Sequence, residues 1–196
     1  MANKKSLCIA AVMALLLCLP AGCSLTGGAG SRSFVRENVD LGYVEKIAVL
    51  PLQNNSKDEF APEMLRDIII TRVFATKLFD VIDKGLVDSM LREEAIDAGK
   101  PIDGPTARRL GQRLGVQALL LGTVDMATEG RKGSVVYPEM AATLRLLDTE
   151  SGQVIWQAGG NASGDSLARR LFGLSGRDSY QVATGLVNDL IRTVPR

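Results

Sequence analysis

The sequence predicts an α/β (α+β) sandwich, in which a mixed sheet of about five strands is covered by about four helices. Two observations lead to this prediction. Short apolar runs bounded by turn residues alternate with longer segments whose apolar residues recur at helical spacing. Towards the C-terminus, three strand-like runs follow one another before a final amphipathic segment. The expected order of elements is therefore β-α-β-α-α-β-β-β-α.

Strands and helices alternate in the first half of the domain. Residues 46–52 form a compact apolar run that ends in a polar cluster, as a buried strand does, and residues 78–82 form a second short strand. Pro62 suits the first turn of the helix between them. Two further helices follow, and the later one contains Gly111 and Gly115. We assign these two glycines to close helix packing and helix termination.

The second half of the domain is dominated by strands. Residues 116–124 are nearly all apolar, which predicts a central strand buried on both faces of the sheet. Residues 140–148 alternate in polarity and are predicted to pair, through a tight turn, with a strand at 154–158. We expect Leu121 and Trp156 to be buried where these strands meet the helices.

Two segments between these elements are predicted to be loops. Residues 125–138 are polar, and residues 159–176 are rich in glycine and serine. Each segment carries two adjacent basic residues beside apolar ones, and loops on a rigid scaffold commonly carry function. The candidate partner-binding residues are Arg131, Lys132, Tyr137, Arg169, Arg170 and Phe172. The alternative is that both segments are merely mobile loops.

The N-terminal segment has the parts of an export signal. Lys4 and Lys5 precede an apolar run of 13 residues, 7–19, which is too short to span a bilayer permanently. Two small residues then stand directly before Cys23. The segment resembles a bacterial lipoprotein signal with its lipobox, although Pro20 stands where that family usually has leucine. An ordinary secretory signal cut nearby is the alternative.

This signal divides the chain into three parts. Residues 1–22 are the expected signal peptide, 23–43 a lipidated cysteine with a flexible tether, and 44–196 a periplasmic domain. Lipid on Cys23 would hold the protein to a membrane. Ser24, rather than aspartate, follows that cysteine, which by the enterobacterial sorting rule indicates the periplasmic face of the outer membrane.

Composition excludes several classes of function. The 23 basic and 22 acidic side chains are evenly mixed and leave a formal net charge of +1, which gives no electrostatic footprint for nucleic acid. The chain has no histidine, so it lacks the commonest general base and transition-metal ligand. Cys8 and Cys18 would leave with the signal peptide, so no cysteine metal site remains. We expect neither an enzyme nor a bound cofactor or metal.

Four motifs in a fixed order indicate a family. They are residues 46–52 (Lys-Ile-Ala-Val-Leu-Pro-Leu), 79–83 (Phe-Asp-Val-Ile-Asp), 110–122 and 144–156, the last ending in Val-Ile-Trp. Together they resemble the CsgG-type curli-secretion lipoproteins and their small relatives, which include LpoB-type activators of peptidoglycan synthases and the TolB amino-terminal domain. The fold that this resemblance implies agrees with the sandwich predicted from the residues.

The resemblance implies a function through binding. Pore-forming members contribute two long hairpins to a membrane pore, and each spanning strand needs about 9–11 residues. The candidate insertions here have 14 and 18 residues, too few for such hairpins. We therefore expect a lipid-anchored periplasmic adaptor of an envelope machine, in secretion or peptidoglycan synthesis, that binds an envelope protein complex. The alternative is an oligomeric subunit of a curli-like secretion channel. In that case the chain would form a homo-oligomer. For a third possibility, a small-molecule-binding module, the sequence shows no cluster of polar residues that would bind a ligand.

Overall fold

The fold is one mixed sheet with helices on both faces. The computed structural model describes residues 31–37, 40–97, 100–165 and 176–195. Within these residues it has seven strands, four α-helices and one 3-10 turn. The elements in chain order are β1 (Arg32–Val35), η1 (Leu41–Tyr43), β2 (Lys46–Val49), β3 (Gln53–Asn54), α2 (Ala61–Thr76), β4 (Asp80–Val81), α3 (Lys84–Glu93), α4 (Gly104–Leu114), β5 (Ala118–Lys132), β6 (Val135–Asp148), β7 (Val154–Ser163) and α6 (Ser179–Ile191).

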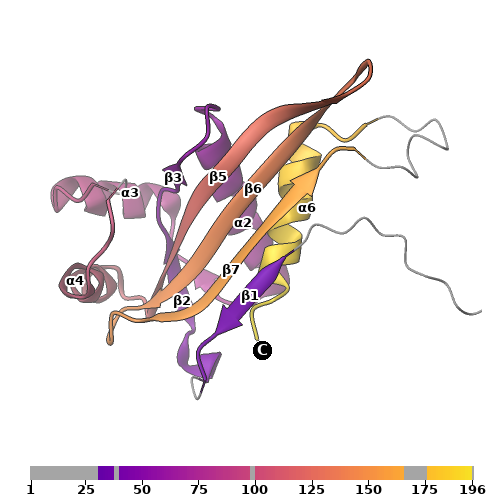
Figure 1. Cartoon of the computed structure of the whole chain (residues 1–196). Helices are drawn as coiled ribbons and strands as arrows, with labels where there is room; N and C mark the ends of the chain where they lie inside the picture. Colours follow the sequence, from indigo (N-terminus) through magenta and orange to yellow (C-terminus); the bar gives the residue numbers. More distant parts are fainter. Residues whose placement is uncertain (1–30, 38–39, 98–99, 166–175, 196) are drawn as a thin grey trace, which may run out of the picture.

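The sheet combines a parallel and an antiparallel part (Figure 1). Its strand order is β1-β7-β6-β5-β2-β4, and β3 also pairs with β5. β2 runs parallel to β4 and β5, whereas β5, β6, β7 and β1 pair in antiparallel fashion. Without the short elements β1, η1 and β3, the order is the predicted β-α-β-α-α-β-β-β-α, so the predicted fold class is confirmed.

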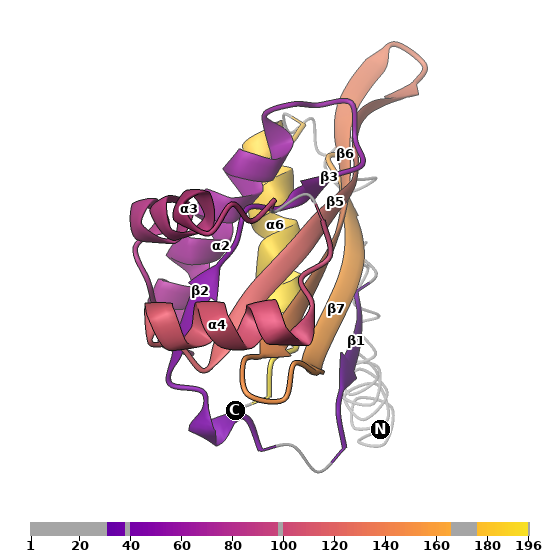
Figure 2. The same cartoon turned by 90° about the vertical axis from the view of Figure 1, so that its left-hand side faces the viewer.

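Two hydrophobic cores sandwich the parallel part of the sheet. α2 and α6 pack on one face, and α3 and α4 pack on the other (Figure 2). β2 supplies both cores because side chains alternate along a strand: Ile47 faces α2 and α6, and Ala48 faces α3 and α4. Leu121 and Trp156 are buried as predicted, one in each core. The Trp156 indole nitrogen donates a hydrogen bond of 3.2 Å to the Thr193 hydroxyl.

Local sequence signals set the ends of the helices. Asp83, Asp103 and Asp178 cap the N-termini of α3, α4 and α6, and each carboxylate accepts a hydrogen bond from a backbone N–H of the first turn. Pro62 lies in the first turn of α2. Gly115 ends α4 in a left-handed conformation with φ of 65°.

A buried ion pair joins α2 to α3 and was not predicted from the sequence. The Arg66 side chain is 1% exposed, and its guanidinium donates to both carboxylate oxygens of Asp88, at 2.7 and 3.1 Å. It also donates twice to the carbonyl oxygen of Val49 on β2. Because four hydrogen bonds and a carboxylate compensate this charge, it can occupy an interior position on a helix face.

The structure differs from the sequence-based predictions in three places. β1 lies inside the segment 23–43, of which we expected residues 24–33 to be a tether and considered residues 34–43 as an edge segment, and it pairs with β7 at the edge of the sheet. The prediction that residues 125–138 form a loop is wrong, because β5 and β6 continue through this segment as a paired hairpin. β7 also extends to Ser163, into the second expected loop. Within the described residues, no helix is long and apolar enough to cross a membrane.

Candidate functional site

The most distinctive feature of the surface is a β-hairpin that projects beyond the sheet. We call the part of β5 and β6 that lies beyond Val124 the arm, and Figures 1 and 2 show its outer end standing clear of the helices. The base of the arm still pairs with β7, as far as Glu139 opposite Ser163. Val124 is the last β5 residue with a neighbour on its β2 side, since β3 ends at Asn54 and the N–H of Asn55 donates to the Val124 carbonyl. The arm continues to Lys132, a distance of about 26 Å at the usual rise of a strand.

A tight turn closes the arm. Lys132 and Val135 are cross-strand partners, so the loop has two residues, Gly133 and Ser134. Gly133 has φ of 63°, whereas Ser134 does not have a positive φ. This is the pattern of a type II′ turn, which favours glycine at its first central position and matches the twist of a hairpin.

Tyr137 and Gly130 stiffen the middle of the arm. They face each other across the two strands, and a Cβ built on Gly130 would lie 2.4 Å from the Tyr137 ring. The ring therefore covers the bare backbone of the opposite strand and is half-buried. Tyr137, which the sequence suggested as a partner-binding residue, thus contacts its own hairpin.

The tip of the arm is basic and apolar. We define the tip as Arg131, Lys132, Val135 and Val136; all four residues are exposed, and each valine is 46% exposed. In the described part of the chain no carboxylate pairs with Arg131, and the Lys132 ammonium lies 4.0 Å from the Asp165 carboxylate. The remaining predicted site residues lie outside the described residues: Cys23, Arg169, Arg170 and Phe172.

A groove lies at the base of the arm. It has a volume of about 420 Å³ and is lined by residues 57–58 before α2, 127–129 of β5, 138–140 of β6 and Ser179 at the start of α6. Two aromatic residues are neighbours of this lining in the sequence: Phe60 directly precedes α2, and Tyr180 lies in the first turn of α6. Their side chains are 81% and 60% exposed. These residues come from four separate parts of the chain, so no local sequence signal could group them.

The groove is acidic. Asp58, Glu129 and Glu139 line it, and Lys57 is the one basic residue among its lining. The Glu129 side chain lies on the face of Pro138, whereas that of Glu139 lies on the opposite face of the hairpin, beside Tyr137. The Asp58 carboxylate accepts the backbone N–H of Phe60 at 2.9 Å. Within the described residues, neither glutamate has a hydrogen bond or an ion pair. The protein therefore carries uncompensated negative charge at the base of the arm and positive charge at its tip.

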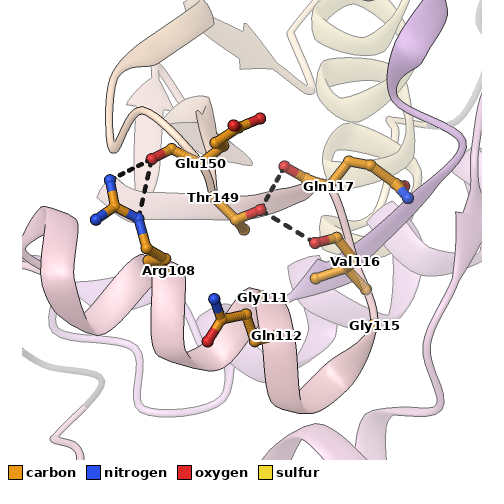
Figure 3. A pocket seen from close by; sticks show the side chains of 8 residues that line it. All are labelled: Arg108, Gly111, Gln112, Gly115, Val116, Gln117, Thr149 and Glu150. Atoms are coloured by element: carbon orange, nitrogen blue, oxygen red, sulfur yellow. Dashed lines mark hydrogen bonds between the residues drawn. The ribbon is translucent and has the colours of Figure 1, made fainter.

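A second concavity, of about 580 Å³, lies between α4 and the turn from β6 to β7 (Figure 3). Its polar groups are used for packing. The Thr149 hydroxyl binds the carbonyl oxygens of Val116 and Gln117 at 3.1 and 2.9 Å, and Arg108 donates twice to the carbonyl oxygen of Glu150. Since these groups bind one another, the concavity offers no pair of free groups for acid–base chemistry.

Close contact between α4 and this turn explains the spacing of two glycines. A Cβ on Gly111 would lie 2.4 Å from the Thr149 Cβ, so only glycine allows this approach. The expected role of Gly111 in packing and of Gly115 in termination is confirmed. Beside the turn, burial and a hydrogen bond to Asp148 raise the pKa of Tyr43 to about 12.

The described residues contain no group of three or more histidine, cysteine, aspartate or glutamate side chains that could hold a metal ion. The site is instead a surface: a rigid sandwich domain with a charged, partly apolar arm. Such a surface is suited to binding other macromolecules.

Comparison with known proteins places the domain in a family. The model of the GNA1162-like lipoproteins matches residues 43–195, so the chain belongs to the GNA1162-like lipoprotein family. A search of curated protein sequences finds no significant match. The match supports the expected lipoprotein class, but it gives no support to the CsgG-type resemblance or to a role in curli assembly.

Solved structures share the fold. The PelC dodecamer from Paraburkholderia phytofirmans is 18% identical, with a TM-score of 0.59 over 85% of this chain and 99% of that one. Lipoprotein GNA1162 from Neisseria meningitidis is also 18% identical, with a TM-score of 0.55 over 76% of this chain and 93% of that one. The LpoB C-terminal domain from Salmonella enterica matches at 11% identity and a TM-score of 0.46, over 60% and 81%. One of the small relatives we expected is thus among the matches, at a similarity too low to carry an argument.

Proposed function

We propose that this protein is a lipid-anchored accessory protein of an envelope machine, in secretion or peptidoglycan synthesis, and that it acts by binding proteins and not by catalysis. In this proposal Cys23 carries the lipid and the domain lies on the periplasmic face of the outer membrane. Membership of a lipoprotein family supports the anchor. The proposed partner-binding residues are those of the sequence analysis, among which Arg131, Lys132 and Tyr137 lie on the arm.

The observation that carries the proposal is the arm itself. A two-stranded hairpin without a third strand or a helix against it is marginally stable in water. Beyond the last pair of β6 with β7, Glu139 with Ser163, residues 129–132 and 135–138 nevertheless pair only with each other among the described strands, over about 13 Å, and end in exposed valines beside basic side chains. A contact that covers these groups would explain both the length and the composition of the arm.

Self-association is part of the proposal. PelC from Paraburkholderia phytofirmans was solved as a dodecamer, and it shares the fold of this domain. This supports a protein that associates with copies of itself as well as with a larger complex. The channel subunit considered from the sequence has the same support, and the following experiment applies to both.

The test is site-specific photocrosslinking in intact envelopes. A photoreactive amino acid at Val135 is expected to give covalent adducts with protein, because Val135 lies at the tip. The matched control is the same amino acid at Glu150, an exposed residue in the turn at the opposite end of β6. Adducts from position 135 and not from position 150 support the proposal. Equal adducts from both positions, or none from position 135, would refute it.

A further inference from the structure

We propose that the tip of the arm of one copy binds the groove at the base of the arm of a second copy, in a head-to-tail contact. The inference rests on the proposed function, since it names the first protein that the arm meets. It is carried by the complementary charge of two surfaces of the same chain and by the unpaired edge of the arm.

The arm presents a free strand edge next to the groove. Beyond Val124, no described strand pairs with β5 other than β6. Unpaired backbone N–H and C=O groups at an exposed edge are a template for another chain. The groove adjoins this part of β5, because Ala127, Thr128 and Glu129 line it.

The charges of tip and groove match. The tip offers Arg131 and the groove offers Glu129, and neither side chain has a hydrogen bond or an ion pair among the described residues. Such charges across an interface favour the correct partner and its register. The apolar groups also correspond: the exposed Val136, on the same face of the tip as Arg131, would meet Ala127 and Pro138 of the groove.

The two surfaces cannot satisfy each other within one copy. Lys132 and Val135 are paired at the tip, and the pairing continues without interruption to Met126 opposite Ala141. This paired hairpin holds the tip beyond the groove and keeps it from folding back. A second copy is therefore the occupant, and a contact between two different surfaces of identical chains closes into a ring or continues as a fibre.

The test exchanges charges in two variants of the mature, lipidated protein in detergent. The tip variant carries Arg131→Glu and Lys132→Glu, and the groove variant carries Glu129→Lys. Each alone is expected to weaken self-association by about tenfold or more in sedimentation velocity, because like charges then face each other. An equimolar mixture is expected to recover association, since the acidic tip of one variant meets the basic groove of the other. Circular dichroism is the control for folding.

Cysteine crosslinking fixes the geometry. Val136→Cys in the tip variant and Tyr180→Cys in the groove variant are expected to join through a short bismaleimide linker in the mixture. Val136→Cys with Glu150→Cys, at the far end of the sheet, is expected to give no product. Equal crosslinking of both pairs, or unchanged association of the folded single variants, would overturn the proposal.

The two proposals fail in different ways. Photocrosslinks from Val135 that contain only other proteins would overturn the head-to-tail contact and leave the accessory function standing. Photocrosslinks between copies that persist in both charge variants would also overturn the contact between tip and groove. An absence of protein adducts at position 135 would overturn both.

Discussion

Gly111→Ala is expected to destabilise the protein, although glycine-to-alanine changes within helices normally stabilise. The usual gain is about 1 kcal/mol. Here the new Cβ would lie 2.4, 2.6 and 2.7 Å from the Cβ, Cγ2 and Oγ1 atoms of Thr149. Thr149 is held by hydrogen bonds to the carbonyl oxygens of Val116 and Gln117, so it cannot retreat without losing them. Overpacking of this kind costs about 1–3 kcal/mol or more, which outweighs the helical gain.

Urea unfolding followed by the fluorescence of Trp156 measures the effect, because this tryptophan is the only one in the chain and is fully buried. The matched control is Gly185→Ala on α6, where the nearest atom to a new Cβ is an Arg177 guanidinium nitrogen at 3.8 Å. That variant is expected to gain up to about 1 kcal/mol. A double-mutant cycle with Thr149→Gly tests the mechanism, since removing the Thr149 Cβ relieves the clash. If Gly111→Ala is as stable as the Gly185→Ala variant, the close approach of α4 to the turn is wrong.

Three further predictions concern the core and the pH dependence of stability. Asp88→Ala leaves the buried Arg66 charge without its carboxylate and should lower the free energy of unfolding in urea by about 2–3 kcal/mol. This loss is below the range for fully buried pairs because Asp88 is partly exposed. A loss under about 0.5 kcal/mol would contradict the pairing. Trp156→Ala should cost about 3–5 kcal/mol, and an unchanged melting temperature by circular dichroism would contradict its burial. Because the pKa of Tyr43 is raised from 10.0 to about 12, the unfolded chain ionises first as pH rises. Stability is therefore expected to fall between these two pH values, and Tyr43→Phe should remove that part of the fall.

The long apolar and periodic segments were predictable from the sequence. A strand buried on both faces needs a nearly continuous apolar run, and residues 116–124 are such a run. Pro62 and Gly115 mark helix ends through backbone geometry, which is a property of the residue itself. The order of elements follows from these local signals, as does the burial of Trp156.

Segment 125–138 resembles a loop in its sequence because both of its faces meet solvent over most of its length, with only Ala127 packed against the core. It has no burial asymmetry to produce a clean alternation, and its charges and glycines are typical of loops. The sequence does hold one signal, the pair Gly133-Ser134 before the strand-favouring residues Val135 and Val136. Pairing of β5 with β6 continues outward from the buried part of the sheet, so the tertiary register makes these residues a hairpin.

The sequence by itself determined the class of protein: a sandwich domain behind an N-terminal segment with the features of a lipoprotein signal, in a chain without histidine. Only the tertiary structure decided where the candidate surfaces lie. The groove collects residues 57–58, 127–129, 138–140 and Ser179, and the Arg66–Asp88 pair joins two helices. Such contacts depend on distances between elements, and these distances are set by packing against the sheet and not by the pattern of any one segment.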